Sequence, residues 1–257
     1  MKEHKSGPIK TCFIIPVYNH GKTIRALIRD LVCYDIPIII VDDGSDEETK
    51  TYLSSVEREF KQIVLLAREK NGGKGAAVMT GIDKAYDLQC DNALQLDADG
   101  QHDTSAVKFF LEKSAADPGA VICGLPEFDK NAPKSRVNGR KISVFWAKIV
   151  TLSTAIPDAL CGFRVYPVES VFRLIHKHFF DKRMGFDVEI LVRLYWEHIP
   201  LVFYPLQVSY PQGGLSHFHP LRDNIRISFV FTKLFFGMVF RLPSLIRWNF
   251  RRVALHT

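Results

Sequence analysis

The sequence predicts an α/β domain built on a mostly parallel β-sheet with helices packed against it. The first two thirds of the chain alternate short apolar runs with stretches of helical periodicity. Strands that alternate with single helices are typical of parallel βαβ units. The runs are apolar almost throughout, as expected of strands that are covered on both faces. Acidic residues follow two of the runs, at 42–43 and 97–99, and ligands bind at such strand ends.

Five apolar runs are predicted to be strands: residues 11–17, 37–41, 63–67, 92–96 and 120–124. Apolar residues at helical spacing within 24–31 predict the first helix. Ser45 and Glu48 have the spacing of a capping box and predict the start of the second helix. Two further helices are predicted at 75–86 and 105–116, so each connection between strands carries a helical pattern.

The composition suits one folded domain with an excess of positive charge. The chain has 257 residues, 47% of them hydrophobic, and a formal net charge of +6. This charge favours an anionic partner, such as a phosphorylated substrate, an anionic lipid surface or a nucleic acid. The five cysteines are widely spaced without a CxxC pair, which argues against a disulfide framework or a zinc site. We therefore expect reduced thiols in a reducing compartment.

Neither a signal peptide nor a membrane span is expected. Residues 1–10 are polar and lack an apolar core. The longest apolar run, 228–240, is interrupted by Lys233 and is shorter than a bilayer-spanning helix.

The strongest local signal is the segment 97–102 (DADGQH), which follows the fourth predicted strand. Asp97 and Asp99 stand one residue apart and can converge on one hard cation. Magnesium and manganese prefer oxygen ligands and commonly link carboxylates to substrate phosphates. Gln101 can add a neutral oxygen. An exposed turn has a similar composition, because Asp and Gly are common turn formers.

Two weaker signals lie at the ends of other predicted strands. Asp42 and Asp43 can accept hydrogen bonds from a ribose or a base edge, although they also suit the N-terminus of a helix. The segment 71–75 (NGGKG) can present backbone N–H groups and the charge of Lys74 to a phosphate. Gly75 stands where a Walker A loop needs Ser or Thr, so this segment is not a Walker A loop.

Together these motifs resemble the family 2 glycosyltransferases, which have the GT-A fold. The matching segments are 14–19 (IIPVYN), 41–45 (VDDGS), 71–76 (NGGKGA) and 96–102 (LDADGQH), within a match that covers roughly residues 10–215. The last segment is similar to the DADxQH segment of the dolichyl-phosphate and polyprenyl-phosphate sugar synthases. The resemblance implies a Rossmann-like, mostly parallel sheet and an inverting enzyme that uses a nucleotide-diphosphate sugar.

The resemblance also implies roles for single residues on the donor side. The implied donor-binding residues are Pro16, Tyr18, Asn19, Asp42, Asp43, Lys74, Asp97, Ala98 and Asp99. The first three would line the nucleotide pocket, the two adjacent acids would contact the base and ribose, and the lysine would lie near the base or phosphates. Asp97, Asp99 and Gln101 would hold Mg²⁺ or Mn²⁺, which would neutralise charge on the departing diphosphate.

On the acceptor side, the resemblance points to a basic segment at 133–143 (PKSRVNGRKIS), expected to be a loop that faces an acceptor phosphate. The candidate acceptor contacts are Arg136, Arg140 and Arg164, because the guanidinium fork makes paired hydrogen bonds with oxyanions. Those synthases tend to carry an arginine after the fifth strand, where this sequence has 124–126 (GLP). A polyprenyl phosphate and a glycolipid hydroxyl therefore both stay open as lipid-linked acceptors, and a soluble glycan is a further alternative.

The two kinds of acceptor need different chemistry. A hydroxyl nucleophile needs a general base, whereas a phosphate is already anionic and needs none. In many family members an acid in the later part of the domain is that base. The candidates are Asp187, Glu189 and, behind them, Asp158, with Asp187 favoured. The same acids could instead cap helices or pair with neighbouring arginines such as Arg193.

The final part of the chain has a different character from residue 216 onward, so we expect a GT-A domain at 1–215 and a basic amphipathic helical segment at 216–257. Within 222–242, Arg222, Arg226, Lys233 and Arg241 gather in one arc of a helical wheel, with bulky apolar residues opposite. This pattern favours a helix in a membrane interface, although a helix packed on the core would also fit. We expect a cytoplasmic protein, peripheral at the inner face of the cytoplasmic membrane.

Two other classes of function fit less well. Nucleotidyltransferases have a related sheet but open with a glycine-rich basic loop after the first strand, where this chain has 16–19 (PVYN). A nonenzymatic membrane-binding scaffold does not need the intact acidic motif at 97–99. Nucleic-acid binding is not expected, because the aromatic residues of the basic tail are too apolar for a recognition surface. Nothing in the sequence indicates an oligomeric state.

Overall fold

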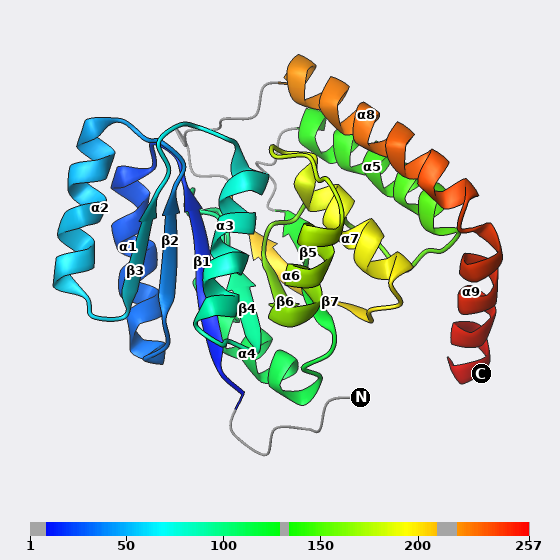
Figure 1. Cartoon of the computed structure of the whole chain (residues 1–257), viewed down its shortest axis with the longest axis horizontal. Coiled ribbons are helices and arrows are strands. Elements are labelled where there is room, and N and C mark those ends of the chain that lie inside the picture. Colours follow the sequence, from blue (N-terminus) through cyan, green and yellow to red (C-terminus); the bar gives the residue numbers. More distant parts are fainter. Residues whose placement is uncertain (1–8, 129–133, 210–219, 257) are drawn as a thin grey trace.

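The computed structural model describes residues 9–128, 134–209 and 220–256. One sheet of seven strands runs through the molecule in the order β3-β2-β1-β4-β6-β5-β7 (Figure 1). The strands are β1 (Thr11–Val17), β2 (Ile38–Asp42), β3 (Ile63–Ala67), β4 (Asn92–Gln95), β5 (Val121–Phe128), β6 (Arg164–Pro167) and β7 (Leu201–Val208). Only β6 runs antiparallel to its two neighbours, β4 and β5. The predicted mostly parallel α/β sheet is confirmed.

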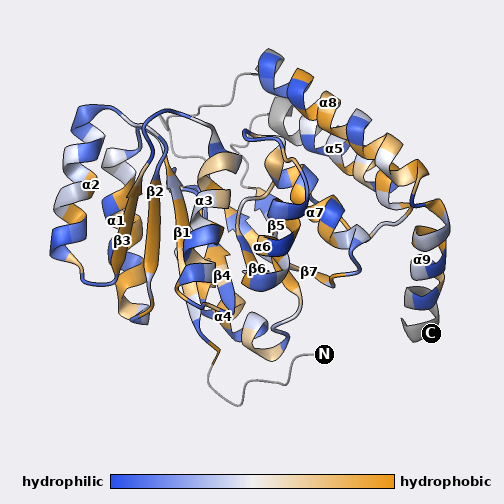
Figure 2. Cartoon of the chain, viewed as in Figure 1, coloured by the Kyte–Doolittle hydropathy of each residue, from blue (hydrophilic) through white to orange (hydrophobic). Residues whose placement is uncertain are grey.

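Helices cover both faces of this sheet. They are α1 (Gly21–Leu31), α2 (Glu47–Glu59), α3 (Lys74–Asp87), α4 (Val107–Ala116), α5 (Lys134–Thr151), α6 (Val168–Lys177), α7 (Phe186–Trp196), α8 (Pro220–Val239) and α9 (Leu242–His256), with short 3₁₀ turns at Val32–Tyr34 and Thr104–Ala106. Buried side chains of α1, α2 and α4 form one core with the sheet, and those of α3, α6 and α7 form a second core on its other face. The apolar strands stand out between these layers in Figure 2.

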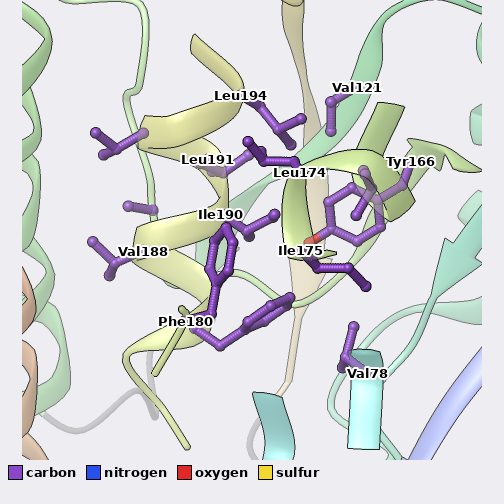
Figure 3. Close-up of a cluster of buried hydrophobic side chains, with 14 of the residues drawn as sticks. Val78, Val121, Tyr166, Leu174, Ile175, Phe180, Val188, Ile190, Leu191 and Leu194 are labelled. Carbon is purple, nitrogen blue, oxygen red and sulfur yellow. The ribbon is translucent and has the colours of Figure 1, made fainter. Parts of the chain in front are cut away.

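The larger of the two cores gathers elements from the whole second half of the chain. Figure 3 shows Val78 of α3, Tyr166 of β6, Leu174 of α6 and Leu191 of α7 meeting in one cluster. Every residue of α7 is buried, including its polar ones. This helix is therefore enclosed by its neighbours, and its position determines where its acidic side chains lie.

The register of the central strands brings the predicted motifs to one edge of the sheet. Val17 pairs with Asp42, and Asp42 pairs with Ala67, so β1, β2 and β3 end level with each other. Gln95 at the end of β4 pairs with Ile14 of β1, which places the following acidic segment beside the end of β1. The carboxyl ends of parallel strands share an edge, and this edge is where the site lies.

The structure differs from the sequence predictions in three local features. The basic segment 133–143 is not a loop from residue 134 onward, because α5 begins at Lys134. The fifth strand continues to Phe128, so the 124–126 segment lies within β5 and not after it. The N-cap of α2 is Asp46, whose side chain accepts a hydrogen bond from Thr49 N at 2.9 Å, so the predicted Ser45 cap is wrong.

The two C-terminal helices follow one another with a sharp bend. Among the described residues, no single helix has both the length and the apolar composition to cross a bilayer. Segments 222–239 and 242–251 meet the same criterion only when they are taken together, and they are bent by 84°. One side of α8 packs on α5 and α7, which Figure 1 shows beside it.

Candidate active site

A cavity of about 900 Å³ opens at the carboxyl ends of β1 and β4. It is lined by the ends of the central strands, the start of α3, the middle part of α5 and the first turns of α7 and α8. Of the residues expected at the site, the cavity is lined by Pro16, Tyr18, Asp43, Lys74, Asp97, Ala98, Asp99, Gln101, Arg140 and Asp187. Residues from the whole chain therefore meet at the predicted edge of the sheet.

Lys74 lies between two carboxylates at the centre of this cavity. Its Nζ is 2.8 Å from Asp97 Oδ1 and 2.9 Å from Asp187 Oδ2. Burial by itself would lower the pKa of the Lys74 ammonium, but the charges of Asp187 and Asp97 outweigh burial and raise its pKa. Burial opposes ionisation of Asp97 as well, yet Lys74 next to it holds the pKa of that carboxyl below its usual value. Lys74, Asp97 and Asp187 therefore form one ion-paired triad in the cavity.

Asp43 organises the glycine-rich turn that precedes α3. Its two carboxylate oxygens accept hydrogen bonds from Gly72 N at 3.0 Å and Gly73 N at 2.7 Å. Arg68 Nε lies 2.9 Å from Asp43 Oδ1 and compensates its charge. Gly73 has a φ of +100°, and a Cβ there would lie 2.4 Å from Arg183 Cγ, so the turn requires glycine. The N–H groups of Gly72 and Gly73, which the sequence suggested for a phosphate, are thus bonded to Asp43 and hold the turn at the end of β2.

Two of the expected donor residues support this region without lining the cavity. Asp42 is buried and accepts a hydrogen bond from Ser45 N at 2.9 Å. Asn19 has a left-handed φ of +55°, its N–H donates to Ser45 Oγ at 3.0 Å, and its Oδ1 accepts from Asp46 N at 2.9 Å. The loop after β1 is therefore tied to the loop after β2. A direct donor contact of Asp42 or Asn19 stays a prediction.

The acidic segment after β4 has the donor atoms that a hard divalent cation prefers. Asp97, Asp99 and Gln101 all line the cavity, and Asp99 Oδ1 also accepts a hydrogen bond from Gln101 N at 3.1 Å. Within the described ranges, no group of three or more His, Cys, Asp or Glu side chains is arranged to hold a metal by itself. A cation bound here would need further oxygens, and Mg²⁺ and Mn²⁺ are divalent cations that accept carboxylate, amide and phosphate oxygens.

Among the cavity residues that the sequence did not predict, two lie close to the central ion pair. Gly162 lies so close to the central ion pair that a Cβ would stand 2.6 Å from both Asp97 Oδ2 and Lys74 Nζ. His102 also lines the cavity. Desolvation lowers the pKa of its ring, although the nearby charges of Asp97 and Asp99 act to raise it. His102 belongs to the DADGQH segment, whereas no local signal marks Gly162.

The residues expected on the acceptor side fall into different environments. Arg140 of α5 lines the cavity and is 2.5 Å from Asp158, whose other oxygen accepts hydrogen bonds from Leu160 N and Cys161 N. Arg164 is only 1% exposed, and its guanidinium donates to Tyr166 Oη and to the carbonyls of Asp187 and Ala159. It lies behind the cavity wall and supports the start of α7. The side chain of Arg136 lies outside what the structure describes.

The two candidate bases on α7 face opposite ways. Asp187 lines the cavity, and among the described residues its Oδ1 has no hydrogen-bond partner. Glu189 is fully buried, and its Oε1 lies 2.8 Å from Arg193 Nε and 2.7 Å from Lys233 Nζ. Glu189 thus fastens α8 to α7, whereas Asp187 is part of the cavity lining and pairs with Lys74 there.

Comparison with known proteins decides the family. The family model described as "Glycosyl transferase family 2" matches residues 12–179, which is more than half of the chain. The chain belongs to glycosyltransferase family 2. The matched range contains the strand ends, the glycine-rich turn and the acidic segment described above, so this family 2 enzyme has its donor-side motifs within the matched part.

Curated relatives of this glycosyltransferase include two dolichyl-phosphate enzymes. The UDP-N-acetylglucosamine–dolichyl-phosphate N-acetylglucosaminyltransferase of Methanococcus voltae is 26% identical over 243 residues, covering 88% of this chain and 93% of its own. The dolichyl-phosphate β-glucosyltransferase of Dictyostelium discoideum is 28% identical over 236 residues, covering 84% and 70%. The alignment with each relative extends over most of this chain.

A solved structure confirms the GT-A fold. The glucosyl-3-phosphoglycerate synthase of Mycobacterium tuberculosis, in complex with Mn²⁺, UDP and phosphoglyceric acid, superposes with a TM-score of 0.65. The two proteins share 14% identity, and the match covers 90% of this chain and 78% of the synthase. At this identity the likeness concerns the fold alone.

Proposed function

We propose that this glycosyltransferase moves a sugar from a UDP-linked donor to a polyprenyl phosphate, with a divalent metal and inversion at the anomeric carbon. The observation that carries the proposal is the composition of one cavity. Asp43, Asp97 and Asp99 gather at the strand ends on one side, and Arg140, Arg183 and Arg222 line the same cavity. The acids suit a ribose and a metal-bound diphosphate, and the arginines suit the phosphate of an acceptor. The dolichyl-phosphate enzymes among the relatives support this choice of acceptor.

The proposed reaction breaks one bond and forms one. An oxygen of the acceptor phosphate attacks the anomeric carbon from the face opposite the diphosphate. The bond between that carbon and the β-phosphate oxygen breaks, and the nucleoside diphosphate leaves with both electrons. A metal held by Asp97, Asp99 and Gln101 would supply Lewis-acid neutralisation of the leaving group. Because the attacking phosphate is anionic, no side chain has to remove a proton.

The residues of this chain have separate tasks in that reaction. Asp43 holds the glycine-rich turn beside the nucleotide, and Lys74 provides positive charge next to the leaving diphosphate. The Arg140 guanidinium is held by Asp158, so it is oriented before an acceptor arrives. We further propose that the enzyme works as a peripheral protein on the cytoplasmic face of the membrane, where nucleotide sugars and polyprenyl phosphates meet.

One observation favours a second acceptor. Asp187 Oδ1 is buried beside the cavity without a hydrogen-bond partner among the described residues, as would suit a base for an acceptor hydroxyl. The two acceptors predict different effects of removing this carboxylate. With a hydroxyl acceptor the Asp187→Asn variant would be inactive, whereas a phosphate acceptor needs no base.

The direct test is product analysis with a defined acceptor. The purified protein is incubated with Mn²⁺, a panel of UDP-, GDP- and dTDP-sugars, and either a short-chain polyprenyl phosphate or the matching polyprenol. We expect a polyprenyl monophosphate sugar with one UDP-sugar, seen by mass spectrometry, and no reaction with the polyprenol. Transfer to the polyprenol but not to its phosphate would support the hydroxyl acceptor instead. Transfer to neither lipid, by a protein that binds the donor, would contradict a lipid-linked acceptor.

A further inference from the structure

Helices α5, α7 and α8 pack against one another as a group of three. Since α7 is buried along its whole length, α5 and α8 form the outer layer of this group. Figure 1 shows these two helices lying side by side along one edge of the molecule. The sides of α5 and α8 that point away from α7 therefore contribute to one outward surface.

The apolar residues of α8 divide between two opposite sides of the helix. Ile227, Val230, Phe231, Leu234 and Met238 are buried against the protein. On the other side, Ile225, Phe229 and Phe236 recur at helical spacing and are 53%, 71% and 60% exposed, and Phe240, directly after the helix, is 85% exposed. The sequence had suggested bulky apolar residues opposite the basic arc. The structure shows this exposed set beside the basic arc, so the outward side is itself both apolar and basic.

Helix α5 continues this outward surface. Ile142 and Phe145 are 62% and 59% exposed, and Trp146 is partly exposed where it meets Phe231 of α8. Exposed bulky apolar side chains on two adjoining helices are unusual for a protein surface that contacts only water. We define the docking surface by seven exposed apolar residues, six on the two helices and Phe240 directly after α8: Ile142, Phe145, Trp146, Ile225, Phe229, Phe236 and Phe240.

Basic side chains border this docking surface. Lys141 and Lys148 are exposed on α5, and Arg222 is exposed at the start of α8. Arg226 lies one turn further along α8, and its nearest acid, Asp181, is 3.9 Å away. A combination of aromatic side chains with a basic border is complementary to a lipid surface that has anionic headgroups.

The same two helices also form part of the cavity wall. Gly139, Arg140 and Ser143 of α5 line the cavity, as do Arg222 and Asn224 of α8. The docking surface is thus continuous with the side of the cavity that has the acceptor arginines. A lipid whose phosphate enters the cavity would have its chain next to exposed aromatic residues.

We propose that the outward sides of α5 and α8 are a docking surface for an anionic lipid bilayer, in which the exposed aromatic residues enter the headgroup region. This inference deepens the proposed function and rests on it for its purpose, since it names the surface that meets the lipid. Binding in the plane of the interface fits better than insertion across it. The inner side of α8 is part of the core, and its Lys233 is bound to the buried Glu189.

The test is co-sedimentation with vesicles, without donor or acceptor, so that its outcome is independent of catalysis. Wild-type protein is mixed with vesicles of phosphatidylcholine or of an equal mixture of phosphatidylcholine and phosphatidylglycerol. We expect stronger binding to the mixed vesicles, weakened by salt. The double variant Phe229→Ser/Phe236→Ser should bind them about tenfold or more weakly, because two aromatic side chains no longer enter the interface.

A matched control removes an exposed aromatic residue from the opposite face of the sheet. Phe109 of α4 is 40% exposed, and Phe109→Ser should bind vesicles like the wild type. Thermal unfolding of the double variant should match the wild type, which excludes misfolding. Undiminished vesicle binding by the double variant would overturn the proposal. Two other outcomes would also overturn the proposal. Wild-type protein that stays with the vesicles during alkaline extraction would be inserted across the bilayer. A wild-type protein that forms a dimer but does not bind vesicles, with the dimer lost in the double variant, would make this surface a protein interface.

Discussion

Replacement of Lys74 by methionine is expected to destabilise the protein far more than loss of a typical surface ion pair. The ammonium of Lys74 lies within 2.9 Å of both Asp97 and Asp187, and the side chain is only 15% exposed. Methionine keeps most of the volume but leaves two carboxylates facing each other without a cation. Removal of one partner from a buried pair costs about 3–5 kcal/mol, because the remaining charge is uncompensated.

The expected magnitude lies at the lower end of that range. Asp97 is 23% exposed and can regain some hydration, whereas Asp187 is 5% exposed and cannot. A loss of about 3 kcal/mol in a domain of this size corresponds to a fall of roughly 6–12 °C in the melting temperature. Differential scanning calorimetry of the metal-free protein near neutral pH measures this fall directly.

The matched control is Lys50→Met. Lys50 Nζ is 2.7 Å from Glu47 Oε1, but both side chains are exposed, and exposed ion pairs contribute little to stability. We expect Lys50→Met to melt with the wild type. If the two lysine variants melt at the same temperature, burial does not make the pairing of Lys74 with Asp97 and Asp187 stronger than an exposed ion pair.

The pH dependence of the Lys74→Met effect has a definite sign. In the wild type the pKa of Asp97 is lowered, so its pairing stabilises the fold above the unfolded carboxyl pKa. That contribution disappears as the pH falls through the folded pKa. The gap in melting temperature between wild type and variant should therefore be widest near neutral pH and should narrow below about pH 4.

Three further changes separate residues of the cavity from residues that support it. Gly162→Ala should weaken donor binding in calorimetry by displacing the adjacent ion pair, whereas Gly119→Ala, whose added Cβ has only one neighbour, at 4.0 Å, should bind normally. Asp99→Asn should remove the dependence of donor binding on Mn²⁺, and retention of that dependence would contradict the proposed metal site. Glu189→Gln should lower the melting temperature, because Lys233 and Arg193 lose their counter-charge. It should leave donor affinity unchanged, and a loss of affinity would place Glu189 in the site.

Much of the donor half could be predicted from the sequence. A short apolar run flanked by helical patterns is best explained as a buried strand, and the run 63–67 is indeed β3 with the same bounds. Parallel strands end at a common edge, so the acids after β2 and β4 could be expected to face one cavity before any coordinates were known. The glycine-rich turn joined them there because Asp43 binds its backbone.

Local patterns did not reveal the elements whose character comes from distant contacts. The short strand β6 includes the charged Arg164, which is buried only because carbonyls and Tyr166 satisfy its guanidinium. Helix α5 begins in a basic stretch that suggested a loop, and of its described side chains only those on the side with Ala147 and Val150 are buried, where it packs against α7 and α8. In both cases, contacts with residues far away in the sequence lower the free energy needed to bury the segment, and a local pattern does not contain those contacts.

The sequence by itself determined the type of sheet, the order of the donor motifs and the family resemblance, since these depend on periodicity and on short runs of residues. The tertiary structure alone decided that Lys74 pairs with Asp187, that Glu189 on the same helix does not reach the cavity, and that Gly162 lies beside the central ion pair. These facts follow from how α7 packs between its neighbours, because the direction of a side chain relative to a cavity is set by packing and not by its position in a motif.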